Sequence, residues 1–297
     1  MLKKAVITAA GLGTRLYPAT KIIKKELFPI VDRDGLVKPI IQIIIDELVQ
    51  SGIAEVCLIV QPEDKPVFQH YFNQPLSAKQ ISQLGNKPQI IRATETVLDL
   101  GKRISYALQD IQDGFGHAVY CAKDWVGNEP FLLLLGDHVY ISHTELSCTQ
   151  QLINVFHKYQ KSVSGVVRTP ESILYRFGTI GGKPIKDDNR VYEITEFKEK
   201  PNIEYAREHL QISGLAKDEY LCVFGQYILT PGIFDCLSYH IEHNLRERNE
   251  IQLTSSLEML RQQESYYAYE TQGDRYDIGV PEGYIETITA FANKNKR

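Results

Sequence analysis

The chain has 297 residues, of which 43% are hydrophobic and 24% charged, and its formal net charge is −4. This composition is typical of a globular protein with a sizeable core, and the negative balance argues against a general affinity for nucleic acid. Five cysteines without a C-x-x-C spacing argue against a zinc site or a disulfide framework, and no apolar run reaches the roughly 18 residues that indicate a membrane-spanning helix, so we expect a cytoplasmic protein.

The first 60 residues predict a β-loop-α-β unit. Residues 4–9 form a short apolar strand candidate, and a glycine-bearing loop follows at 10–15. Residues 39–50 are apolar nearly all round, which predicts a helix buried against a sheet, with a proline in its first turn and a glycine at its C-terminal cap. Residues 56–60 predict a buried parallel strand.

The middle of the chain continues this alternation. We expect helix and loop at 62–102, a strand at 103–109, a short helix at 114–123 and a longer helix at 144–161. Phe131–Leu135 is the clearest buried strand, and it ends at Gly136 and Asp137.

Residues 163–230 are rich in β-branched and aromatic side chains, with turns predicted at 181–182 and 187–189. Further elements are expected as helices at 231–239, at 251–264 and from 281, with a strand near 266–270. The whole pattern predicts an α/β protein with a doubly wound, mixed and mostly parallel sheet flanked by helices, and an antiparallel-rich region in its second half.

Two predicted strand ends carry chemically useful residues, and ligands of open α/β sheets bind beyond such ends. The first is Gly11-Leu12-Gly13-Thr14-Arg15, whose glycines allow backbone N–H groups to cradle an anion, while Arg15 and Lys25 supply positive charge. Leu16 stands where a dinucleotide fingerprint needs its third glycine, and no Walker motif occurs. If only the glycines are considered, the alternative to an anion-binding loop is an ordinary turn before a solvated basic stretch.

The second strand end with a chemically useful residue is that of Phe131–Leu135, which is followed by Asp137. A carboxylate at the rim of a sheet suits Mg²⁺, a hard cation that prefers oxygen ligands. A lone aspartate in this place could equally begin a turn. The charged run at 196–200 has a similar alternative, because it could be the solvated edge of a strand.

Several motifs occur together and in order: A-A-G-L-G-T-R-L-Y-P-A-T-K at 9–21, K-E-L-F-P at 25–29, G-F-G-H-A-V at 114–119, E-K-P at 199–201, N-E-I-Q-L-T at 249–254 and D-I-G-V-P-E-G-Y at 277–284. In these motifs the chain resembles the bacterial UTP–glucose-1-phosphate uridylyltransferases of the sugar nucleotidyltransferase superfamily. The resemblance implies a Rossmann-like nucleotide-diphospho-sugar transferase fold in one domain over 1–297. Its nucleotide-binding half would be about 1–142 and its sugar-phosphate-binding half about 143–297.

The resemblance also implies roles for individual residues. Nucleotide-binding residues would be Ala10, Gly11, Gly13, Thr14, Glu26, Gln109 and Gly114, with Glu26 and Gln109 hydrogen-bonding uracil. Sugar-binding residues would be Gly178, Glu199 and Lys200. The catalytic cations would be Arg15, Lys25 and Lys200, and the Mg²⁺ ligands Asp137 and Asp277.

The implied reaction is in-line attack of glucose 1-phosphate on the α-phosphorus of UTP, with Mg²⁺ as cofactor and a homo-oligomer as the expected assembly. A sugar phosphate is already ionised, so the reaction needs cations and positioning rather than a general base. One alternative keeps the fold and uses dTTP, CTP, ATP or another sugar 1-phosphate. The other is a non-catalytic homologue, against which the intact Arg15, Lys25, Asp137 and Lys200 argue.

The chain departs from the family pattern in several places. The turn at 31–39 is longer than usual, and 62–102 matches poorly. Asp110 stands where glycine is usual, Gly136 where proline is usual, and Gln226 where arginine is usual.

Overall fold

Four parallel strands form the centre of the first half, where the sequence predicts them. The computed structural model describes residues 2–85 and 87–294, so the two ends of the predicted 1–297 domain lie outside the described residues. The four strands are β1 (Lys4–Thr8), β4 (Glu55–Val60), β5 (Ile104–Leu108) and β6 (Phe131–Leu135). Strand β1 lies between β4 and β6, and β5 lies outside β4.

Both faces of β1, β4 and β6 are buried, which explains their nearly continuous apolar sequences. Val6 and Leu133 belong to one hydrophobic cluster, whereas their neighbours Ile7 and Leu132 belong to another. Helix α1 (Ile40–Gln50) packs into the second of these clusters. Helices of the opposite face are α5 (Phe115–Tyr120), α6 (Lys123–Val126), α9 (Ile233–Glu242) and α10 (Leu253–Gln263).

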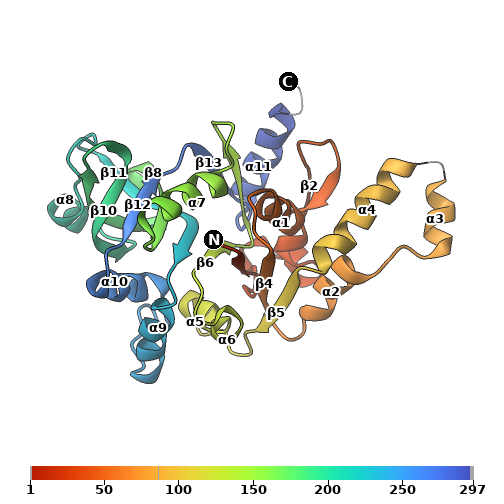
Figure 1. The fold of residues 1–297 in the computed structure, drawn as a ribbon, viewed down its shortest axis with the longest axis horizontal. Helices are drawn as coiled ribbons and strands as arrows, with labels where there is room; N and C mark the ends of the chain where they lie inside the picture. The colour runs from red at the N-terminus through yellow and green to blue at the C-terminus, as the bar shows by residue number, and fades with distance from the viewer. Residues whose placement is uncertain (1, 86, 295–297) are drawn as a thin grey trace.

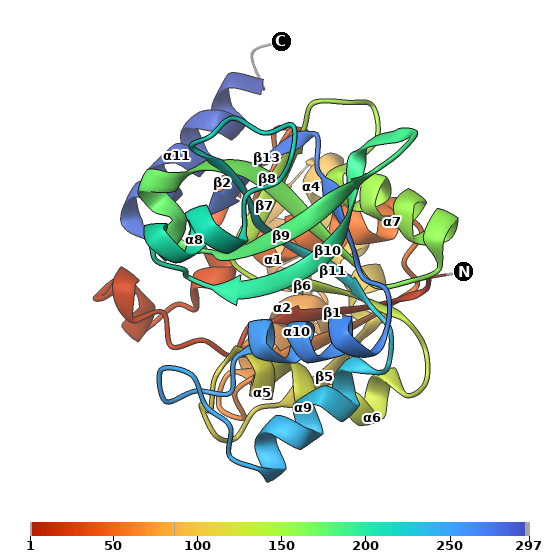
Figure 2. The ribbon, with the colours of Figure 1, turned by 90° about the vertical axis from the view of Figure 1, so that its left-hand side faces the viewer.

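The second half adds five strands to the same sheet: β8 (Val163–Pro170), β9 (Gly178–Ile185), β10 (Asp188–Glu199), β11 (Glu219–Leu229) and β12 (Tyr267–Glu270). The order among the described strands is β5-β4-β1-β6-β11-β8-β12-β10-β9, and only β8 and β12 pair in parallel within the second half (Figures 1 and 2). Strand β11 runs antiparallel to β6 and thereby joins the two halves.

The predicted turn at 181–182 is wrong, because both glycines lie inside β9. A Cβ on Gly181 would come within 3.2 Å of the carbonyl oxygen of His209, so glycine serves close backbone approach here rather than chain reversal. The chain turns instead between β9 and β10, next to the predicted turn at 187–189. The region also contains α8 (Ile203–His209), which the β-rich composition did not predict.

Remaining helices lie close to their predicted places: α2 (Lys65–Asn73), α3 (Ala78–Leu84), α4 (Pro88–Gly101), α7 (Cys148–Tyr159) and α11 (Pro281–Lys294). Helix α7 begins later than the predicted residue 144, because the side chain of Ser147 caps it by accepting from the N–H of Gln150. Helix α3 lies far from the main sheet (Figure 1). Among the described helices, none is long and apolar enough to cross a membrane.

Two small sheets were not predicted. The longer turn at 31–39 forms a hairpin of β2 (Pro29–Val31) and β3 (Val37–Pro39). Strands β7 (His138–Ser142) and β13 (Gly273–Asp277) pair antiparallel, with His138 opposite Asp277. This second sheet positions Asp277 beside the end of β6.

Candidate active site

A cavity of about 500 Å³ lies beyond the carboxyl ends of β1 and β6. Predicted site residues that line it are Ala10, Gly11, Gly13, Thr14, Arg15, Lys25, Glu26, Gln109, Gly114 and Asp137. The two strand ends singled out in the sequence therefore meet in one cavity.

The glycine loop after β1 is held by side chains that bind its carbonyl groups. Gln61 donates to the carbonyl of Ala10 over 2.6 Å, and Lys24 donates to that of Gly11 over 3.2 Å. Gly13 has a φ of +64°, and a Cβ there would lie 3.0 Å from Thr20, so the loop needs glycine at this position.

Lys25 and Asp137 form the electrostatic centre of the cavity. The Lys25 Nζ atom lies 2.5 Å from Asp137 Oδ2 and 3.8 Å from Glu26 Oε1. Burial opposes the charge of Lys25, but the two carboxylates raise its pKa above the ordinary value. Burial likewise disfavours an ionised Asp137, yet Lys25 and His138 hold its pKa well below the ordinary range. Asp137 is therefore a carboxylate at neutral pH.

Glu26 is a buried acid without a hydrogen-bond partner. Its side chain is 1% exposed, and neither carboxyl oxygen has a hydrogen-bond partner among the residues that the structure describes, although Oε1 lies 3.8 Å from Lys25 Nζ. Burial raises the pKa of Glu26 to about 7, while Lys25 lowers it by less. Buried polar groups are normally hydrogen-bonded, so a buried carboxyl group without a hydrogen bond in a cavity wall indicates a ligand-binding role.

Asp137 and Asp277 approach each other, as the metal prediction requires. Ligand atoms of Asp137, His138 and Asp277 all lie within 4.8 Å of one another. A Cβ on Gly279 would lie 2.7 Å from Asp137 Oδ2, 2.9 Å from Asp277 Oδ1 and 3.2 Å from Arg15 Nη2. Two carboxylates at this separation fit a hard divalent cation, and only a glycine leaves room between them and Arg15.

The base side of the cavity is built by two segments distant in sequence. Gln109 donates to the carbonyl of Gly114 over 3.2 Å. Gly114 has a φ of +100°, and a Cβ there would lie 2.7 Å from the carbonyl oxygen of Ile251. Glu250 consequently joins the cavity wall, which the analysis of N-E-I-Q-L-T at 249–254 did not predict.

The three predicted sugar-binding residues cluster at the edge of the β9–β10 pair. Gly178 lies opposite Glu199 in the strand register. Glu199 Oε2 accepts from Thr254 over 2.7 Å, and its Oε1 lies 3.2 Å from Lys200 Nζ. Glu199 and Thr254 line a second cavity of about 340 Å³, separate from the first.

Gln226, which stands where arginine is usual, lies inside the protein. Its amide donates to the hydroxyl of Thr149 over 3.0 Å, and its side chain is fully buried. This departure from the family pattern thus concerns contacts between β11 and α7 and not the walls of either cavity.

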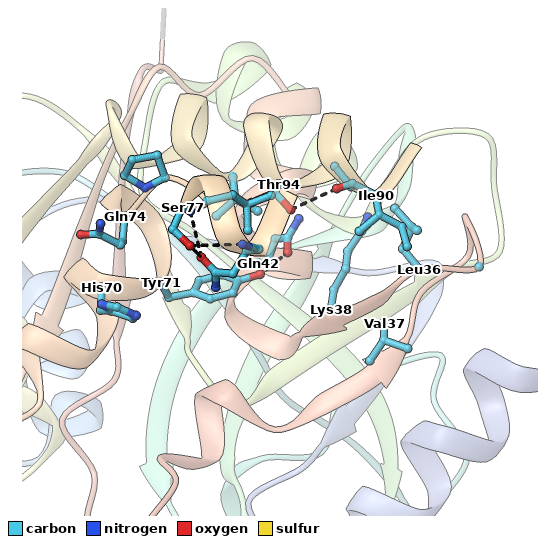
Figure 3. A pocket seen from close by; sticks show the side chains of 16 residues that line it. Leu36, Val37, Lys38, Gln42, His70, Tyr71, Gln74, Ser77, Ile90 and Thr94 are labelled. Atoms are coloured by element: carbon cyan, nitrogen blue, oxygen red, sulfur yellow. Dashed lines mark hydrogen bonds between the residues drawn. The ribbon is translucent and has the colours of Figure 1, made fainter. Parts of the chain in front are cut away.

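The two segments that depart most from the family pattern enclose a third cavity, of about 760 Å³, between the β2–β3 hairpin and α2 to α4 (Figure 3). Its one lysine, Lys38, lies within 2.6–3.2 Å of Asp32, Asp34 and Asp46. Three carboxylates more than balance this ammonium, so among the residues described around this cavity Lys38 is not available to bind a nucleotide phosphate.

Comparison with known proteins identifies relatives along the whole chain. A family model described as nucleotidyl transferase matches residues 4–294. A UTP–glucose-1-phosphate uridylyltransferase of Staphylococcus haemolyticus is 38% identical over 296 residues, which cover 100% of this chain and 94% of the relative. A second such enzyme, from Staphylococcus saprophyticus, is 37% identical, covering 99% and 93%.

Solved structures show the same relationship. An apo UDP-glucose pyrophosphorylase superposes with a TM-score of 0.83 at 33% identity, covering 99% of each chain. A UDP-glucose pyrophosphorylase complexed with UDP-glucose gives 0.80 at 33% identity, covering 99% of this chain and 100% of the other. A UTP-bound enzyme from Acinetobacter baumannii gives 0.79 at 26% identity, covering 98% and 93%.

Proposed function

Because this chain belongs to the nucleotidyl transferase family, we propose that it transfers uridylyl from UTP to glucose 1-phosphate, giving UDP-glucose and pyrophosphate. The α/β fold and the family resemblance predicted from the sequence are both confirmed by these relatives. The names of the relatives favour UTP and glucose 1-phosphate over the alternative nucleotides and sugars.

One observation carries the proposal: Lys25, Asp137 and Glu26, a buried acid without a hydrogen bond, meet in a single cavity beyond the strand ends. The ammonium group suits a triphosphate, the ionised carboxylate suits a divalent cation, and the buried acid suits a polar base edge.

Two polyanions must be brought together for the reaction. Arg15 and Lys25 would hold the triphosphate and stabilise the departing pyrophosphate, and Lys200 would hold the sugar phosphate. Asp137 and Asp277 would hold a divalent cation, for which we propose Mg²⁺; when bound, it supplies positive charge against the phosphate oxygens. The phosphate of glucose 1-phosphate is ionised, so no side chain has to remove a proton from it.

Nucleotide choice would depend on Glu26 and Gln109. An ionised Glu26 accepts a hydrogen bond from the N3–H of uracil and repels the N3 lone pair of cytosine. The backbone of Ala10, Gly11, Gly13, Thr14 and Gly114 would surround the base and phosphates. Gln109 would lie beside the base, held in place by the hydrogen bond that its amide nitrogen donates to the carbonyl of Gly114.

Glu199 would accept hydrogen bonds from glucose hydroxyls, with Gly178 beside it. Both oxygens of Glu199 already contact Thr254 or Lys200, so this carboxylate is oriented before a sugar arrives. We further propose a single domain, with halves at about 1–142 and 143–297 for nucleotide and sugar phosphate, and a cytoplasmic homo-oligomer. The β6–β11 pairing supports the single domain, since it makes one sheet of both halves.

Pyrophosphate release tests the function directly. The purified protein, with Mg²⁺ and glucose 1-phosphate, should release pyrophosphate fastest with UTP among UTP, dTTP, CTP and ATP. The matched panel keeps UTP and exchanges glucose 1-phosphate for galactose 1-phosphate and mannose 1-phosphate. Faster release with another nucleotide or sugar would replace the proposed substrates, and no release with any pair would favour a non-catalytic homologue.

A further inference from the structure

His138 lies directly against one of the two proposed metal-binding carboxylates. Its Nδ1 atom is 2.9 Å from Asp137 Oδ1, and the two side chains are only 10% and 8% exposed. The other oxygen, Asp137 Oδ2, lies 2.5 Å from Lys25 Nζ. The two oxygens of Asp137 therefore have different neighbours: the imidazole at Oδ1, and at Oδ2 the Lys25 ammonium together with the space beside Gly279 that Asp277 Oδ1 also borders.

The direction of the hydrogen bond follows from the charge of the partner. Asp137 is ionised beside Lys25 and can only accept. Nδ1 of His138 must therefore carry the proton and donate it to Oδ1. Histidine hydrogen bonds of this kind are known to orient metal-binding groups and to fix a ring tautomer.

The fold fixes the imidazole in this position. His138 is the first residue of β7 and lies opposite Asp277 of β13, so one backbone pair carries both groups. Its ring lies beside Gly225 of β11, where a Cβ would be 3.7 Å from His138 Cδ2. Gly225 has a φ of +91°, which favours glycine, so backbone rather than a side chain borders the ring there.

We propose that His138 is a positioning residue of the metal centre: it holds Asp137 by Oδ1 and thereby presents Oδ2, together with Asp277, to a divalent cation. The inference rests on the proposed function only in requiring that a cation binds at Asp137 and Asp277. Direct coordination by His138 is the competing arrangement, since its ring also lies within the 4.8 Å cluster. A hard cation such as Mg²⁺ prefers oxygen ligands, which favours the donor role.

The experiment measures Mn²⁺ binding to the full chain by electron paramagnetic resonance, without nucleotide or sugar. His138→Val removes the donor, whereas His138→Asn keeps an N–H at the same number of bonds from the backbone. Loss of such an outer hydrogen bond typically weakens metal binding about 10-fold to 100-fold, so we expect that loss for His138→Val and recovery to within about threefold for His138→Asn. His143→Val is the matched control, because His143 pairs with the exposed Asp274 beside the same small sheet, and it should bind Mn²⁺ like the wild type.

Several results would overturn the proposal. Equal affinities in wild type and His138→Val would show that the hydrogen bond does not position the ligand, and equally weak binding by both variants would show that the N–H donor is irrelevant. Electron spin echo modulation of the Mn²⁺-loaded wild type needs no variant, and a directly coordinated nitrogen would establish the competing arrangement. Wild-type binding no tighter than that of Asp137→Asn would remove the metal centre itself. A preference for another nucleotide would change the proposed function and leave these binding results intact.

Discussion

Thr254 donates a hydrogen bond to Glu199 over 2.7 Å, from the first turn of α10 to the last residue of β10. Lys200 contacts the other oxygen of the same carboxylate. Residues 199 and 200 come from E-K-P and residue 254 from N-E-I-Q-L-T, so two motifs some fifty residues apart build one acceptor. A substitution at Thr254 that removes this hydrogen bond therefore tests the orientation of Glu199 without changing the acid itself.

Thr254→Val should weaken the use of glucose 1-phosphate and spare UTP. A hydrogen bond to a charged group contributes about 1.5–3 kcal/mol, so we expect KM for glucose 1-phosphate to rise by at least about tenfold. Thr254→Ser keeps the hydroxyl and serves as the control. Steady-state kinetics with each substrate varied in turn measure both constants, and a rise in KM for UTP alone would assign Thr254 to the other half of the site.

Asp137→Asn should lose at least about a hundredfold in rate, because the amide keeps the shape of the carboxylate but loses the charge that holds the cation. Asp274→Asn, on the exposed side of the same small sheet, is the matched control and should stay near wild type. Turnover is measured at saturating UTP and limiting Mg²⁺. Near-normal turnover of Asp137→Asn would remove Asp137 from the metal centre.

The preference for UTP over CTP should increase with pH. Burial raises the pKa of Glu26 to about 7, so the acid is mostly protonated at pH 6 and mostly ionised at pH 8. The ionised form accepts from the N3–H of uracil, whereas the protonated form donates to N3 of cytosine. From pH 6 to pH 8 the ratio of kcat/KM for the two nucleotides should rise at least about tenfold. Glu26→Gln should flatten this profile; an equally steep profile in the variant would identify another base reader.

Glu26 should also destabilise the ligand-free protein at alkaline pH. Its native pKa of about 7 exceeds the ordinary value of 4.5 that it regains on unfolding. Native Glu26 therefore holds its proton more tightly, and stability is highest below about 4.5 and falls as pH rises through about 7. Glutamine stays neutral, so Glu26→Gln should gain on the order of 3 kcal/mol at pH 8 relative to pH 5. Thermal melting at both pH values measures this, and an equal Tm difference at the two would contradict a buried acid with a raised pKa.

Local sequence patterns predicted the separate parts of the site, and only the family resemblance predicted that these parts converge. An apolar run such as Phe131–Leu135 predicts a buried strand directly, because both of its faces are apolar. Strands β7 and β13 are each five residues long and pair across more than 130 residues of sequence. No local periodicity in the sequence predicts such a pairing. Asp277 was therefore expected from the resemblance alone, and His138 was missed because a histidine after a strand carries no signal until its partner is known.

Glycine gave both correct and wrong predictions for one physical reason. At Gly13 it supplies a positive φ in the loop that was predicted at 10–15, and at Gly114 it supplies one at the N-terminal cap of α5. At Gly181 it lies in a strand because a neighbouring carbonyl approaches closely, and the sequence does not distinguish this use from a turn. The hairpin at 31–39 and the α3–α4 region were likewise recognised as departures, but their shared cavity emerges only from tertiary packing.

The antiparallel pairing of β11 with β6 has a consequence for synthesis of the chain. Strand β6 ends at Leu135, but its partner does not begin until Glu219. In a nascent or truncated chain that stops between them, one edge of β6 has no partner strand, and this edge includes the apolar residues Leu132, Leu133 and Leu134. Unpaired apolar edges promote association between chains, so a fragment ending before β11 should aggregate, although it contains every predicted nucleotide-binding residue.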